Sequence, residues 1–150
     1  MSAPPTAERP ARLAREAFAL WRPMPTRWMD NDVYGHVNNV VYYSYFDTAV
    51  NAFLVEQGLL DLAGSSVIGL VAETGCVYFE SVAFPESLEV GLSVSRLGRS
   101  SVTYLIGIFR EGGAFAAAQG RFVHVYVDRE EGRPAPVPEP IRAALEPLLR

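Results

Sequence analysis

The sequence predicts an α+β domain in which an antiparallel five-stranded sheet wraps around one central helix, with a short helix at the C-terminus. Three observations favour this class. One long stretch has the apolar spacing of a buried helix, one extended segment precedes it, and four extended segments joined by short links follow it. Because the apolar faces of the helix and the sheet must both leave water, the two elements are expected to pack as layers.

The chain is expected to divide into a leader and one domain. Residues 18–150 are enough to bury a hydrophobic core without disulfides, so they are predicted to fold as a single domain. Residues 1–17, rich in Pro, Ala and Arg, are predicted to form a flexible or helical leader. The first extended segment, Phe18 to Met29, contains Pro23 and Pro25. Proline is tolerated in strands mainly at a sheet edge, which predicts an edge strand here.

The central helix is predicted from Asn39 to Gln57, where apolar residues recur at intervals of three and four. Its apolar face consists of Tyr42, Tyr45, Phe46, Ala49, Val50 and Phe53. Asn38 or Asn39 is expected to cap the N-terminus of the helix. Gly58 stands where a residue in the left-handed conformation commonly ends a helix.

Four segments after the helix have the pattern of strands. They are Val67 to Phe79, Leu88 to Leu97, Ser101 to Arg110 and Phe115 to Asp128. The links between them are short, which favours antiparallel neighbours in chain order. Residues 130–140 are expected to form a loop and Ile141 to Arg150 a short closing helix. One strand, one helix and four further strands is the order of a hot-dog fold.

Composition excludes several classes of protein. The net charge of −4 provides no basic field for nucleic acid, and no apolar run is long enough to cross a membrane. The N-terminus lacks the apolar core of a signal peptide, which favours a cytoplasmic protein. Cys76 is the single cysteine, so the chain has neither an internal disulfide nor a zinc site built on a cysteine pair.

The segment from Thr26 to Tyr42 concentrates the chemistry of the chain. It holds two carboxylates, Asp30 and Asp32, a turn glycine and a histidine immediately before the predicted helix. The first N–H groups of a helix have no partner within the helix, so a carboxylate placed beside them can face a site that stabilises an oxyanion. This pairing suits acyl-transfer chemistry.

These residues carry a resemblance to a known family. The sequence resembles the hot-dog thioesterases of the 4-hydroxybenzoyl-CoA thioesterase type, including the long-chain acyl-CoA thioesterases of bacteria. The resemblance covers nearly the full length and rests on Arg27-Trp28-Met29-Asp30-Asn31-Asp32, on Gly35-His36-Val37-Asn38-Asn39 and on Tyr42. It is reinforced by Tyr78 to Pro85, by Leu97 to Ser101 and by Gly132 to Pro138.

The resemblance implies hydrolysis of acyl-CoA thioesters without a metal or a bound cofactor, since coenzyme A is part of the substrate. It also implies a homodimer or homotetramer with active sites between subunits. Asp32, the second aspartate of the Asp-x-Asp motif, would be the catalytic carboxylate, as nucleophile or general base. The backbone N–H of Asn39 would hold the thioester oxygen, and Asp30 would support the site.

Each remaining residue of the motif has a plainer alternative role. Asp32 could simply cap the turn that contains Gly35. His36 could act as a general acid or only orient the loop. Gly35, Asn38 and Tyr42 are expected to contact the substrate, with Tyr42 part of an apolar acyl pocket, although Asn38 would also serve as a helix cap and Tyr42 as core.

Residues outside the motif are assigned by the same comparison of roles. A tight turn carries the groups expected to hold the phosphates of coenzyme A, or else to form a solvated hairpin tip: Arg96, Arg99, Ser100 and Ser101. Glu73 could contact the pocket or a partner, and otherwise lies on an exposed edge. His124 is expected to be structural and Cys76 buried.

Two other functions stay open. A non-catalytic hot-dog module that binds acyl-CoA or an acyl carrier protein is the main alternative, and the presence of Asp32 disfavours it. A hot-dog dehydratase is a weaker alternative, because the expected pattern around a catalytic histidine is missing. In either case, the unpaired sheet edge near residues 67–79 predicts association with a second copy of the chain.

Overall fold

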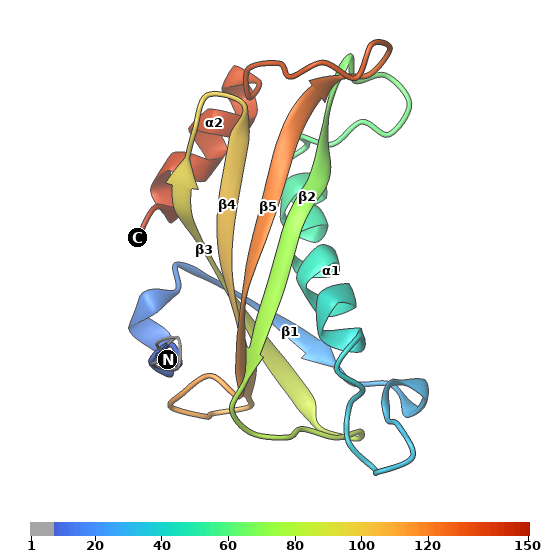
Figure 1. The fold of residues 1–150 in the computed structure, drawn as a ribbon, viewed down its shortest axis with the longest axis vertical. Coiled ribbons are helices and arrows are strands. Elements are labelled where there is room, and N and C mark those ends of the chain that lie inside the picture. The colour runs from blue at the N-terminus through green and yellow to red at the C-terminus, as the bar shows by residue number, and fades with distance from the viewer. Residues whose placement is uncertain (1–7) are drawn as a thin grey trace, which may run out of the picture.

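The computed structural model describes residues 8–150, and residues 1–7 of the expected leader lie outside that range. Five strands form one antiparallel sheet, and the long helix α1 (Val41–Glu56) packs across one of its faces (Figure 1). The strands are β1 (Leu20–Pro25), β2 (Val67–Tyr78), β3 (Ser87–Leu97), β4 (Ser101–Arg110) and β5 (Ala118–Asp128). A short helix α2 (Glu139–Leu145) follows. The predicted α+β hot-dog architecture is confirmed.

The strand order corrects one expectation from the sequence. The order is β1-β3-β4-β5-β2, so β2 and β3 are not neighbours although the link between them is short. Instead, β2 pairs with β5, with Val67 opposite Asp128 and Tyr78 opposite Ala118. The link runs across the end of the sheet and is fixed there, because the N–H of Val37 donates to the carbonyl of Val82 at 2.8 Å. Both β1 and β2 are edge strands, as expected.

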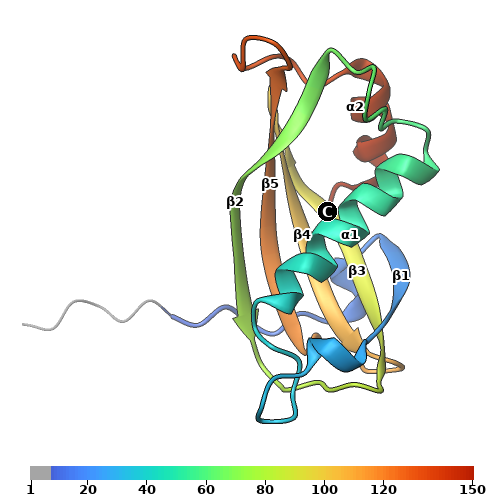
Figure 2. The ribbon, with the colours of Figure 1, turned by 90° about the vertical axis from the view of Figure 1, so that its right-hand side faces the viewer.

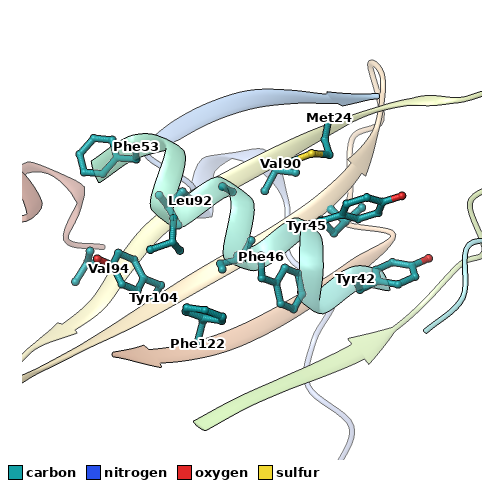
Figure 3. Close-up of a cluster of buried hydrophobic side chains, with 14 of the residues drawn as sticks. Met24, Tyr42, Tyr45, Phe46, Phe53, Val90, Leu92, Val94, Tyr104 and Phe122 are labelled. Carbon is teal, nitrogen blue, oxygen red and sulfur yellow. The ribbon is translucent and has the colours of Figure 1, made fainter. Parts of the chain in front are cut away.

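The core lies between α1 and the sheet. All six residues of the predicted apolar face of the helix are buried, and Figure 3 shows several of them against strand residues such as Leu92 and Phe122. Phe46 has no exposed surface and rests on Gly120 of β5, where an added Cβ would lie 2.3 Å from the Phe46 ring. The glycine therefore permits the close approach of helix and sheet.

The two ends of α1 are capped in different ways. Gly58 has φ of +69° and ends the helix as expected. At the N-terminus the helix begins at Val41, and its first residues are preceded by a turn. Asn38 caps this turn, since its Oδ1 accepts the N–H of Val40 at 3.1 Å, whereas Asn39 makes no side-chain cap.

A smaller apolar cluster lies on the sheet face opposite α1. Phe18, Phe109 and Ala116 form its buried centre. Residues 9–17 run beside it and include one turn of 3-10 helix, Arg15–Ala17. Gln119 of β5 ties this segment down, because its Oε1 accepts the N–H of Leu13 and its Nε2 donates to the carbonyl of Ala11, both at 2.9 Å.

Candidate active site

The loop between β1 and α1 folds back on itself immediately before the helix (Figure 2). The N–H of Asp32 donates to the carbonyl of His36 at 2.8 Å, and the N–H of Gly35 donates to the carbonyl of Asp32 at 3.1 Å. Gly35 has φ of +81°, a conformation that other residues rarely adopt. The backbone conformation therefore explains why a glycine occupies this position, whether or not it contacts a substrate.

The side chain of Asp32 makes one hydrogen bond within the loop. Its Oδ1 accepts the N–H of Tyr34 at 2.9 Å, which is the turn-capping role named as the plainer alternative. The side chain is half-buried and its second oxygen, Oδ2, has no protein partner within residues 8–150. One oxygen thus holds the turn, and the other is left for a ligand or a water molecule.

A cavity of about 490 Å³ adjoins this loop. It is lined by Asp32, Tyr34, His36, Val37, Asn39, Tyr42, Tyr78, Phe79, Glu80 and Ser81. The structure thereby brings together four residues singled out from the sequence, namely Asp32, His36, Asn39 and Tyr42. Gly35 and Asn38 belong to the same loop but do not line the cavity.

An unused backbone donor lies just before α1, on Asn39, which lines this cavity. The Tyr78 hydroxyl donates to the carbonyl of Asn39 at 2.9 Å, and the next N–H, that of Val40, is taken by Asn38. Within the part of the chain that the structure describes, the N–H of Asn39 itself has no partner. An unpaired N–H at a helix N-terminus, aided by the helix dipole, is suited to bind an oxyanion.

Asp30 supports the loop from the inside. It is 1% exposed, and it accepts hydrogen bonds from the Tyr45 hydroxyl at 2.7 Å and from the N–H and Nε of Arg27 at 2.8 and 3.0 Å. Burial by itself would raise the pKa of the Asp30 carboxyl, but these bonds and the Arg27 charge outweigh it, so the pKa lies below its ordinary value. Asp30 is therefore an ionised, hydrogen-bonded carboxylate that anchors the loop to α1.

Aromatic rings form one wall of the cavity. Tyr42 and Tyr78 meet edge to face with ring centroids 4.9 Å apart. Burial raises the pKa of Tyr42 to about 12, so its hydroxyl is neutral at physiological pH. Phe79 and Glu80 continue the wall, and Glu80 is paired with Arg12 at 2.6 Å.

The sequence does not predict that the wall from Tyr78 to Ser81 belongs to the site. These residues were part of the resemblance, but the expected hairpin between β2 and β3 gave them no reason to approach Asp32. They reach the cavity because the chain crosses the end of the sheet after β2. Only a correct strand order could have revealed them.

The residues expected to hold coenzyme A phosphates lie elsewhere in the subunit. Arg96, Arg99, Ser100 and Ser101 surround the turn between β3 and β4, at the end of the sheet opposite the loop of residues 26–40 (Figure 1). Since β3 alone has 11 residues, the two ends are about 30 Å apart at the usual rise per strand residue. Within one copy of the chain these residues do not join the cavity.

Two further findings bear on the setting of this site. No helix in the described range combines the length and apolar character needed to cross a membrane. His124 is buried in β5 with 3% exposure, far along the sheet from Asp32, and does not line the cavity.

Comparisons with known proteins give one consistent result. The model of the thioesterase-like superfamily matches residues 26–145. The solved PA5185 protein from Pseudomonas aeruginosa strain PAO1 is 53% identical, covers 93% of this chain and 97% of its own, and superposes with a TM-score of 0.89. The PA2801 protein from Pseudomonas aeruginosa, described as a candidate thioesterase, is 32% identical, covers 89% of this chain and 98% of its own, and has a TM-score of 0.76. YsmA of Bacillus subtilis (strain 168), an uncharacterized protein, is 25% identical over 134 residues, 89% of each chain.

Proposed function

Since this chain belongs to the thioesterase-like superfamily, we propose that it hydrolyses acyl-CoA thioesters to a free acid and coenzyme A. One observation carries the proposal. The free Oδ2 of Asp32 and the unpaired N–H of Asn39 belong to residues that line the same cavity of about 490 Å³. A base or nucleophile and an oxyanion donor around one carbonyl are the minimum that thioester hydrolysis requires.

The chemistry can follow two routes from this geometry. In the first, Asp32 takes a proton from water while the water oxygen bonds to the thioester carbon. In the second, the Asp32 oxygen bonds to that carbon directly, and water then cleaves the resulting anhydride. In both routes the oxyanion that develops on the thioester oxygen accepts a hydrogen bond from the N–H of Asn39. The carbon–sulfur bond then breaks, and the thiolate leaves and is protonated.

The remaining lining residues would bind the substrate. Tyr42 and Tyr78 offer apolar ring surface to the acyl group or the arm that carries it. His36 is exposed, lines the cavity and has no side-chain partner among the described residues, and its proposed role is to donate a proton to the leaving thiolate. The cavity carries two carboxylates, Asp32 and Glu80, and no Lys or Arg, which disfavours binding of the coenzyme A phosphates inside it.

The phosphates therefore belong outside the cavity. The candidate phosphate site consists of Arg96, Arg99, Ser100 and Ser101. Because the length of the sheet separates these residues from Asp32 of the same subunit, they could bind only the phosphates of a substrate held by another subunit. The test is substitution of Arg99 by Ala. We expect a higher KM with kcat unchanged, and an unchanged KM would leave the turn as plain surface.

A dimer through β2 is the assembly that the sheet favours. β2 is an edge strand whose outer backbone groups have no strand beside them, and Leu70 and Val71 are 51% and 48% exposed. Such an edge readily pairs with a second copy of itself. Sedimentation at micromolar concentration is expected to show a homodimer or homotetramer, and a monomer would contradict this proposal.

Hydrolysis is tested with acyl-CoA substrates of graded chain length and with aromatic ones, by following free thiol. We expect turnover of at least one class and a fall of several orders of magnitude in kcat for Asp32→Asn, which keeps the shape but removes the anion. A panel without turnover, combined with tight acyl-CoA binding, would favour a non-catalytic binding module instead.

Asp61 offers a matched control. Its Oδ1 also caps a turn, accepting the N–H groups of Ala63 at 3.1 Å and Gly64 at 3.0 Å, but it lies outside the Asp32 cavity. Asp61→Asn should leave kcat unchanged. If both substitutions lowered kcat equally, loss of a turn rather than loss of a catalytic carboxylate would explain the Asp32 result.

A further inference from the structure

A second cavity lies at the other end of α1. It has a volume of about 420 Å³ and is bounded by the turn after the helix, the start of β2 and the proline-rich segment before α2. Figure 2 shows these three segments together at the end of the sheet opposite the loop of residues 26–40. Its apolar lining includes Leu59, Val67, Pro136 and Ile141, and it shares no residue with the Asp32 cavity.

A small inner chamber of about 30 Å³ adjoins this outer cavity. The two share Leu59, Ser65, Val67 and Ile141 in their linings. The outer volume is that of an ordinary small-molecule site, whereas the inner one is about the volume of a single water molecule in the liquid. A ligand could therefore place its body in the outer cavity and only one small group in the inner chamber.

His124 lines the inner chamber and is not satisfied by the protein. The residue is 3% exposed, and its Nδ1 is fully buried without a hydrogen-bond partner. Its ring is surrounded by the rings of Phe122 at 5.1 Å and Tyr104 at 5.7 Å, neither of which accepts or donates a bond to it. Buried polar atoms nearly always have a partner, so an orphan beside an open chamber points to a ligand.

Gly69 keeps the chamber open. A Cβ at this position would lie 3.3 Å from Nδ1 of His124 and 3.2 Å from the ring of Tyr126. Any larger residue would fill the space in front of the unpaired nitrogen. Gly75 on the same strand has nothing within 4 Å of such a Cβ, so glycine is not required there for space.

We propose that the two cavities form one binding site for an uncharged amphiphile, with a hydroxyl group bonded to Nδ1 of His124 and an apolar body in the outer cavity. A hydroxyl both donates and accepts, so it can pair with either tautomer of the imidazole. Burial lowers the pKa of His124, which keeps the ring neutral. No Lys or Arg lines either cavity and Asp61 lines the outer one, so a carboxylate or phosphate is disfavoured.

The site is tested with three matched probes, namely benzyl alcohol, toluene and benzoate. Binding is followed through the amide NMR signals of Gly58 and Gly69 and the imidazole nitrogen signals of His124. We expect saturable shifts with benzyl alcohol, about tenfold weaker binding of toluene, which lacks the hydroxyl, and no competition by benzoate. Absence of shifts at these glycines would overturn the proposal and leave water as the occupant of the chamber.

Two variants separate the roles of space and polarity. His124→Phe should bind benzyl alcohol no better than toluene. Gly69→Ala, which retains the histidine, should weaken benzyl alcohol at least tenfold, whereas Gly75→Ala should not. Equal binding by wild type and Gly69→Ala would refute the site even if His124→Phe failed to fold. Asp32→Asn should bind the probes as wild type does, so the outcome does not depend on the proposed hydrolysis.

Discussion

Two buried tyrosines offer a direct measurement of what a hydrogen bond contributes to this fold. The Tyr45 hydroxyl donates to the ionised Asp30 carboxylate at 2.7 Å, whereas the Tyr104 hydroxyl is fully buried with no partner. Substitution by Phe removes only the oxygen in each case. The two variants therefore differ in the bond rather than in the volume lost.

The expected magnitudes have opposite signs. A hydrogen bond to a charged group contributes about 1.5–3 kcal/mol, so Tyr45→Phe should lower the free energy of unfolding by about 2 kcal/mol. In a domain of this size that corresponds to about 4–8 °C in Tm. Tyr104→Phe removes an unsatisfied polar atom, so it should leave stability unchanged or raise it by about 1 kcal/mol.

Chemical denaturation at several pH values is the appropriate assay. The folded-state pKa of Asp30 lies below its unfolded value, so its contribution is fully present above the unfolded pKa of about 3.9 and is lost as the pH falls through the folded pKa. The deficit of Tyr45→Phe should therefore shrink on acidification below about pH 4. Equal destabilisation by Tyr45→Phe and Tyr104→Phe, independent of pH, would refute the reasoning.

Three further predictions concern the site and the core. Tyr78→Phe removes the hydrogen bond to the Asn39 carbonyl. Because one hydrogen bond contributes about 1 kcal/mol, kcat should fall about fivefold with KM unchanged. A change in KM alone would contradict a role of this bond in positioning the backbone at Asn39. Gly120→Ala should lower the free energy of unfolding by about 1–3 kcal/mol in denaturant melts, because the added Cβ would meet the Phe46 ring. An unchanged free energy of unfolding would mean that α1 can move outward. Gly35→Ala should cost about 1–2 kcal/mol in the same melts, because φ of +81° is strained for alanine, and its kcat should fall if the turn positions Asp32.

The helix and most strand limits could be predicted because they depend on local spacing. The six apolar residues of α1 are buried as their periodicity indicated, and β4 begins and ends where expected, at Ser101 and Arg110. Strand pairing is different, because β2 pairs with β5, about 50 residues further along the chain, and nothing in the length of a link distinguishes a hairpin from a crossing.

The residues of the candidate site also divide into those that the sequence could group and those that only the strand order brings together. Asp32, His36 and Asn39 could be grouped from the sequence because they occupy one loop. Glu80 and Ser81 could not, since their approach depends on the strand order. The side-chain chemistry of the turn with Arg96 and Arg99 predicts a phosphate site there, but the length of β3 separates this turn from Asp32 in one subunit. The inner chamber beside His124 left no sign in the sequence, because an unpaired buried atom is visible only in three dimensions.

The N-terminal segment acts on the cavity through its arginines. Arg9 donates to the carbonyl of Tyr78 and stacks over the Phe79 ring at 4.8 Å, and Arg12 pairs with Glu80. Residues 9–12 are thus a brace for the aromatic wall of the cavity. Truncations that remove Arg9 and Arg12, or fusions that displace them, would change the shape of the Asp32 cavity without altering any residue of the motif.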